Sequence, residues 1–221
     1  MRYQYFYLFC LSFCFVFLSC KRGPRKKATS EENISNAVAA PAQNSLKSFK
    51  HENGERFTAK PIHTVDGDTY DILLEGNIQE RVRMNGIDAP ERGMPYYKKS
   101  KRFLDSLLSI NDKVTLQFIK YDESNGGWGK DEKKLRVICD SYIEIDGTEF
   151  SIDYLLIKAG LAWHFKRFSS RKDFAEAEIS ARKKKINIWS YPKPMAPWNN
   201  RKLHRAGVST KDSFIISEIN E

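Results

Sequence analysis

The chain has 221 residues, of which 41% are hydrophobic and 13% aromatic, and its formal net charge is +9. This length suits one domain with appendages, or at most two small domains, and it excludes a large multidomain assembly. The basic balance favours a polyanionic partner, either nucleic acid or an anionic membrane surface, and a solvated basic surface is the alternative.

Residues 1–19 are predicted to be a secretory signal. The stretch Tyr3–Leu18 is almost wholly apolar but too short for a comfortable membrane span. A small residue, Ser19, directly precedes Cys20, which resembles a bacterial lipoprotein cleavage site, although Phe17 stands where Leu is usual. We therefore expect an exported protein, lipid-anchored to a membrane at Cys20. An ordinary signal peptide, giving a periplasmic or extracellular protein, is the alternative.

The cysteines support this division of the chain. Three of them lie in the leader or at its end, so only Cys139 remains in the body. An exported body of this kind has no internal disulfide framework and no Cys-based zinc site. The histidines show no spacing that favours a transition metal: His51, His63, His164 and His204.

Three further segments follow the leader. Residues 20–55 are predicted to be a disordered basic and polar linker, because they have little apolar periodicity. Residues 56–202 form the folded domain, and residues 203–221 form a C-terminal tail.

The first half of the body predicts three strands and a helix. Strands are expected over residues 57–64, 70–74 and 82–84, the last two separated by a turn at Gly76. A helix is expected over residues 95–109, where apolar side chains recur four residues apart.

The second half adds two strands and two helices. Strands are expected over residues 114–118 and 135–139, and residues 142–145 would extend the latter into a hairpin. A helix ends near Gly160, and a last helix contains Phe174 and Ala181. Five short strands, with a helix after the third and about three helices in all, predict an α+β fold built on an OB-type β-barrel.

Two short acidic clusters, Asp66-Gly67-Asp68 and Asp88-Ala89-Pro90-Glu91, carry the clearest chemistry. Adjacent strands would bring them to the same end of a sheet, where carboxylates without His or Cys suit a hard cation such as calcium or magnesium. Each cluster alone has a simpler interpretation: the first is a common turn, and the second is a good helix start.

Arg83 favours the functional interpretation. Strand alternation buries Val82 and Met84 and turns Arg83 to the other face, toward the acidic clusters. A guanidinium beside a carboxylate-bound cation can neutralise charge developing on a phosphoryl group. A surface salt bridge is the alternative.

These motifs resemble the signature of the thermonuclease (staphylococcal-nuclease-like) family. The similarity runs from about Phe57 to about Lys202. It includes the two acidic clusters with Arg83, the segment Ala159–Phe165, and two C-terminal stretches, Asn187-Ile188-Trp189 and Pro197-Trp198.

The resemblance implies a role for each matching position. Asp68 and Asp88 would bind calcium through their side chains, and Ala89 would do so through its backbone carbonyl. Glu91 would activate or position the attacking water, and Arg83 would hold the phosphate. The aromatic residues near the nucleotide would be Phe165 and Phe168, with core packing as the alternative.

One motif departs from the family. The family's second catalytic arginine lies in a Tyr-Gly-Arg turn, and the similar stretch here is Trp128-Gly129-Lys130. Either Lys130 replaces that arginine or an insertion moves the role to Lys133, and a lysine supplies a point charge without a bidentate fork.

The sequence thus predicts a calcium-dependent endonuclease that hydrolyses DNA or RNA with low sequence specificity and acts as a monomer. The alternative is a non-catalytic OB module that binds nucleic acid or protein, which the replaced arginine favours. A third, weaker possibility is a surface lipoprotein whose basic body adheres to anionic polymers.

Overall fold

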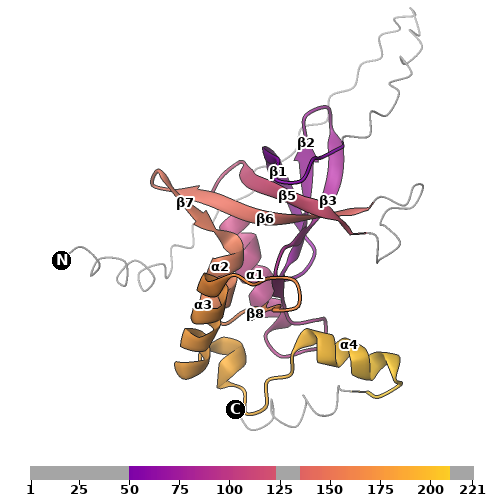
Figure 1. Ribbon diagram of the computed structural model, residues 1–221, viewed down its shortest axis with the longest axis vertical. Helices are drawn as coiled ribbons and strands as arrows, with labels where there is room; N and C mark the ends of the chain where they lie inside the picture. Colours follow the sequence, from indigo (N-terminus) through magenta and orange to yellow (C-terminus); the bar gives the residue numbers. More distant parts are fainter. Residues whose placement is uncertain (1–49, 123–134, 210–221) are drawn as a thin grey trace, which may run out of the picture. The chain divides into compact units, whose positions relative to one another are not determined.

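The computed structural model describes residues 50–122 and 135–209. Its strands, in chain order, are β1 (Arg56–Thr64), β2 (Thr69–Leu74), β3 (Ile78–Met84), β4 (Ile87–Asp88), β5 (Val114–Asp122), β6 (Arg136–Ile145), β7 (Thr148–Ser151) and β8 (Trp163–His164). Its helices are α1 (Tyr97–Leu108), α2 (Ile152–Lys158), α3 (Lys172–Lys183) and α4 (Pro197–Arg205), with a short 3₁₀ helix η2 (Asn187–Ser190) (Figure 1).

Five strands close into a barrel. Strand β1 pairs antiparallel with β2 and with β5, β2 pairs with β3, and β5 pairs with β6. A parallel pairing of β3 with β6, which aligns Val82 with Val137 and Met84 with Cys139, completes the ring. The barrel and its helices confirm the α+β, OB-type fold, in which closure leaves no open sheet edge between the five strands.

Alternating side chains explain why these strands form a filled barrel. Tyr70 and Ile72 of β2, and Val82 of β3, are fully buried in the core. Between them, Asp71 and Arg81 face the other side of the sheet, where Arg81 Nε lies 2.7 Å from an oxygen of Asp71. The period-2 pattern therefore sorts apolar residues inward and ion pairs outward.

The second half of the chain adds the short elements β7, β8 and η2 to those expected, and it differs further at the end of β6 and at α4. Strand β6 runs without interruption to Ile145, and the hairpin forms instead around Asp146 and Gly147, whose φ angles are 50° and 73°. These two left-handed residues make the reversal that joins β6 to β7. The second difference is the added helix α4, which starts with Pro197 at its first turn and extends beyond the expected domain end at residue 202.

The helix end predicted near Gly160 is confirmed at α2, and the structure adds the start of this helix. Ser151 caps its N-terminus by accepting a hydrogen bond from the backbone N–H of Tyr154 at 3.2 Å. Gly160 follows its C-terminus with φ at 64°, and a Cβ there would lie 2.6 Å from the carbonyl oxygen of Ile186. Across the described ranges, no helix combines the length and apolar character needed to cross a membrane.

A carboxyl group is buried beneath β6. Asp153 of α2 has no solvent exposure, and its Oδ2 accepts a hydrogen bond from the backbone N–H of Ser141 at 2.9 Å. Its Oδ1 has no hydrogen-bond partner among the described residues. Burial, reinforced by repulsion from Asp140, raises the pKa of Asp153 well above that of a free carboxyl group.

We therefore expect Asp153→Asn to flatten the pH dependence of stability. The folded protein keeps this proton while the unfolded chain loses it near pH ~4, so stability falls as pH rises above ~4 toward the raised folded pKa. Asparagine mimics the protonated acid and removes this loss, so the stability of Asp153→Asn relative to the parent should be higher at pH ~8 than at pH ~5.

Urea unfolding of both proteins at these two pH values measures the difference. Asp112→Asn is the matched control, because Asp112 is exposed and should change little. Parallel pH profiles for the parent and Asp153→Asn would show that this carboxyl group does not carry a raised pKa.

Candidate active site

The first acidic cluster forms a tight loop between β1 and β2. The backbone N–H of Asp68 donates to Asp66 Oδ1 at 3.0 Å, and the Asp68 carbonyl accepts from the Met84 N–H at 2.9 Å. Gly67 makes this packing possible, since a Cβ there would lie 2.1 Å from Ser100 Oγ and 2.7 Å from the Ala89 Cβ. The glycine therefore lets the loop lie directly against the second cluster and helix α1.

The second cluster follows a turn at the end of β3. Gly86, with φ at 68°, reverses the chain into β4, whose Asp88 pairs with Trp163 of β8. Asp88 is 1% exposed. The next residue joins the two clusters, because the Ala89 N–H donates to Asp68 Oδ2 at 2.6 Å.

The helix-capping interpretation of the second cluster is wrong. The next helix along the chain, α1, begins at Tyr97, with Tyr96 as its N-cap. Glu91 lies in the irregular segment between, and its side chain is 40% exposed. Asp88 and Glu91 therefore do not serve as a helix start, and both carboxylates face the same group, Arg201.

Arg83 lies between the two clusters. It stands opposite Thr69 in the β2–β3 ladder, so its side chain reaches the end of the barrel where both clusters end. Its Nη2 lies 3.3 Å from Asp68 Oδ2 and donates to Asp88 Oδ1 at 3.1 Å, while Nη1 donates to the Met84 carbonyl at 2.9 Å. The side chain is 15% exposed, so this guanidinium is held rigidly among carboxylates.

A second guanidinium, not expected from the sequence, approaches from helix α4. Arg201 Nη2 donates to Asp88 Oδ2 at 2.6 Å, and Nη1 donates to Asp88 Oδ1 at 3.2 Å. Nη1 also donates to Glu91 Oε1. Asp88 is thus clamped by two arginines that are far apart in the sequence.

Negative charge exceeds positive charge in this cluster. Four carboxylates, those of Asp66, Asp68, Asp88 and Glu91, face two guanidiniums, which leaves two negative charges when all are ionised. Burial and repulsion from Asp68 raise the pKa of Asp66 to about 7. Burial also raises the pKa of Asp88 to about 6, although its hydrogen bond from Arg201 opposes the change. The site therefore favours an additional positive charge.

Aromatic residues line the neighbouring surface. The Phe165 N–H donates to the Gly86 carbonyl at 2.8 Å, which places Phe165 beside the start of β4. Its ring stacks on Trp198 with centroids 4.9 Å apart and an angle of 4°, and it meets Phe168 edge to face. Phe165 is partly buried by this packing, whereas Phe168 is 55% exposed.

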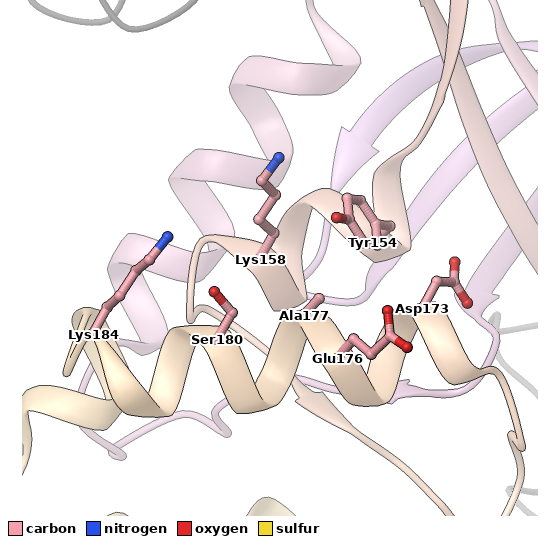
Figure 2. A pocket seen from close by; sticks show the side chains of 7 residues that line it. All are labelled: Tyr154, Lys158, Asp173, Glu176, Ala177, Ser180 and Lys184. Atoms are coloured by element: carbon pink, nitrogen blue, oxygen red, sulfur yellow. The ribbon is translucent and has the colours of Figure 1, made fainter. Parts of the chain in front are cut away.

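A separate recess lies between α2 and α3, with a volume of about 180 Å³. Figure 2 shows Tyr154 and Lys158 of α2 on one side and residues of α3, among them Asp173 and Glu176, on the other. None of the clustered carboxylates or arginines lines it. Its charged residues do not converge on one point, unlike those of the carboxylate cluster.

Two predicted site residues, Cys20 and Lys130, lie outside the described residues, as does the alternative Lys133. Among the residues that the structure does describe, no group of three or more His, Cys, Asp or Glu is arranged to hold a metal ion. A cation at this site would therefore rely on two carboxylates, a backbone carbonyl and water.

Sequence reasoning did not identify Arg201 or the partner of Phe165. One feature of the sequence could have indicated Arg201. It follows Trp198 by three residues in a segment that begins with Pro197, and this spacing places both side chains on one face of a short helix. The pattern does not say what that face contacts.

Comparison with known proteins identifies relatives of this chain. Residues 81–191 match the family model described as staphylococcal nuclease homologue. The chain is 33% identical over 127 residues to "Staphylococcal-like nuclease CAN1" of Arabidopsis thaliana, covering 58% of the chain and 35% of that protein.

Two bacterial proteins match over more of their length. An "uncharacterized endonuclease" of Haemophilus influenzae is 26% identical over 155 residues, covering 70% of the chain and 79% of that protein. "Micrococcal nuclease" of Shigella flexneri is 24% identical over 154 residues, covering 67% of the chain and 83% of that protein. By contrast, the chain spans about a third of the length of the Arabidopsis protein and of a similar rice protein.

Proposed function

The chain belongs to the staphylococcal nuclease homologue family, and we propose that it is a calcium-dependent endonuclease that hydrolyses phosphodiester bonds of DNA or RNA with low sequence specificity. The observation that carries this proposal is the convergence of Asp68, Arg83, Asp88 and Glu91 at one end of the barrel. The nuclease names of the relatives support the same reaction class.

The donor set fits a hard cation. Asp68 and Asp88 would hold calcium by carboxylate oxygens, and Ala89 would do so by its carbonyl. The bonds among the described residues leave a lone pair on Asp68 Oδ1, which accepts only from Thr69, and one on Asp88 Oδ2, which accepts only from Arg201. Bound calcium would neutralise charge developing on the phosphoryl oxygens.

The protein's own groups would perform the remaining steps. Arg83 would hold the phosphate, because its guanidinium is already oriented by the Met84 carbonyl and two carboxylates. The Glu91 side chain is 40% exposed, whereas Asp68 and Asp88 are buried, so Glu91 can orient a water and accept its proton. The water oxygen would form the new bond to phosphorus as the bond to the leaving oxygen breaks, and the leaving oxygen would take up a proton from solvent, so that one water is added across the phosphodiester bond.

Low sequence specificity follows from the neighbouring surface. Phe168 is 55% exposed, and Lys120 and Arg167 lie over its ring at 5.7 and 5.6 Å. An aromatic face flanked by cations stacks on any base and attracts the backbone, which suits single-stranded DNA or RNA. Phe165, packed between Trp198 and Phe168, would support this surface from below.

We expect cleavage to require calcium. The oxygen-only donor set suits calcium, while the tighter octahedral geometry that magnesium demands should support activity poorly. The measurement is digestion of single- and double-stranded DNA, and of RNA, with calcium, with magnesium and with excess chelator. Full activity in chelator would exclude the calcium mechanism, and oligonucleotide binding without cleavage under every condition would favour the binding-module alternative.

We expect Glu91→Gln to lower turnover at saturating calcium by roughly 10²–10⁴-fold, the usual contribution of a general base. Calcium affinity should be kept, whereas Asp68→Asn should weaken it. Glu176→Gln, on the exposed face of α3, is the matched control and should cleave at the parent rate. A Glu91→Gln protein with a near-normal rate would remove Glu91 from the mechanism.

We further propose that the protein is exported and anchored through a lipid on Cys20. The apolar stretch Tyr3–Leu18 followed by Ser19 and Cys20 supports this. We expect Cys20→Ser to move the protein from the membrane fraction of cells to the soluble fraction, as followed by immunoblotting. An unchanged distribution, with cleavage before position 20, would indicate plain secretion.

A further inference from the structure

The guanidinium of Arg201 has two hydrogen-bonding edges, and Asp88 uses one of them. Nη1 and Nη2 each donate to a different oxygen of Asp88, at 3.2 and 2.6 Å, which is the end-on fork of an arginine–carboxylate pair. The second N–H of Nη1 points to Glu91 Oε1. Three of the five N–H groups of this side chain are therefore used.

The other edge, formed by Nε–H and the second N–H of Nη2, has no acceptor among the residues that the structure describes. The side chain is 37% exposed, against 15% for Arg83. This edge is a planar fork of two parallel N–H groups, which matches two oxygens of a phosphate. Arg201 thus carries an unused anion-binding edge at the carboxylate cluster.

Helix α4 holds this arginine in place at a second point. Trp198 lies one helical turn before Arg201, on the same face, and stacks on Phe165 with centroids 4.9 Å apart. Phe165 is in turn bonded through its N–H to the Gly86 carbonyl, next to β4. Aromatic stacking and the ion pairs therefore hold the helix at two points, one beside the start of β4 and one at Asp88.

The two arginines meet at one atom. Arg83 Nη2 and Arg201 Nη1 donate to the same oxygen of Asp88, at 3.1 and 3.2 Å. Asp88 is 1% exposed, so the two guanidiniums are aligned by a single rigid carboxylate. The shared oxygen therefore places the two guanidiniums next to each other at the carboxylate cluster.

We propose that Arg201 is a second phosphate-binding, catalytic arginine of this site, which presents its Nε–Nη2 edge to the phosphate being cleaved. The identity of the ligand rests on the proposed nuclease function. Two guanidiniums would then share the charge that develops on the phosphoryl oxygens. Arg201 lies beyond residue 191, where the match to the family model ends, so this contribution comes from outside the matched region.

The test compares Arg201→Gln and Arg201→Lys in the full chain, with Lys202→Gln as the control on the exposed side of α4. Affinity for a single-stranded oligonucleotide in excess chelator is measured over a series of salt concentrations, so that no cleavage occurs. Turnover at saturating calcium and melting temperature are measured on the same proteins.

We expect Arg201→Gln to weaken oligonucleotide binding about tenfold, to reduce the salt slope by about 0.7 and to lower turnover about 10²-fold. Arg201→Lys should keep its melting temperature and its salt slope, because the ammonium retains the charge and the pairing with Asp88. It should still lose about tenfold in turnover, because it has no fork. Lys202→Gln should stay within about twofold of the parent in turnover.

Four results decide the matter. If the parent cleaves and Arg201→Gln matches it in oligonucleotide affinity, in the salt dependence of that affinity and in turnover, the proposal fails while the nuclease function stands. If the turnover of Arg201→Gln falls only together with its melting temperature, and its oligonucleotide affinity is unchanged, Arg201 only stabilises the docking of α4 and the proposal fails. A parent-like turnover in Arg201→Lys also overturns it. If no protein cleaves but Arg201→Gln loses affinity and slope, the nuclease function fails and the phosphate contact stands.

Discussion

The structure depends on how buried carboxylates at one end of the barrel are compensated. Asp88 is 1% exposed and Asp68 is 6% exposed, and an ionised carboxylate at such positions is costly unless it is paired. Arg83 from β3 and Arg201 from α4 supply the pairing. Because four carboxylates face two guanidiniums, the compensation is incomplete, and this imbalance favours an additional positive charge at the cluster.

The barrel brings these groups together through backbone contacts. The β2–β3 register puts Asp68 beside Met84, and the short β4–β8 pairing holds Asp88. A single hydrogen bond, from the Ala89 N–H to Asp68 Oδ2, then joins the two clusters across 21 positions of the chain. Closure of the barrel is therefore a precondition for the site, since neither cluster could hold its geometry as an isolated loop.

The parts that the sequence predicted are those set by local patterns. Alternation identified the barrel strands and the outward position of Arg83, and the two acidic clusters stood out as short runs of carboxylates beside predicted strands. Arg201 could not be predicted in the same way, because its role depends on where α4 docks, and docking depends on tertiary contacts such as Trp198 with Phe165. The continuous β6 was missed for a related reason, since the left-handed pair Asp146-Gly147 decides where the hairpin turns.

The charge of the whole chain and the charge of the site have opposite signs, and this difference has a mechanistic consequence. The chain carries +9, which attracts a nucleic acid at long range. The cluster of Asp66, Asp68, Asp88 and Glu91 with its two arginines carries two negative charges when fully ionised, which repels the same phosphate at short range. A divalent cation would bring the cluster to neutrality and remove that repulsion. On the proposed function, Arg83 and Arg201 would contact the phosphate even without the metal, and the bound cation would strengthen that contact by removing the repulsion.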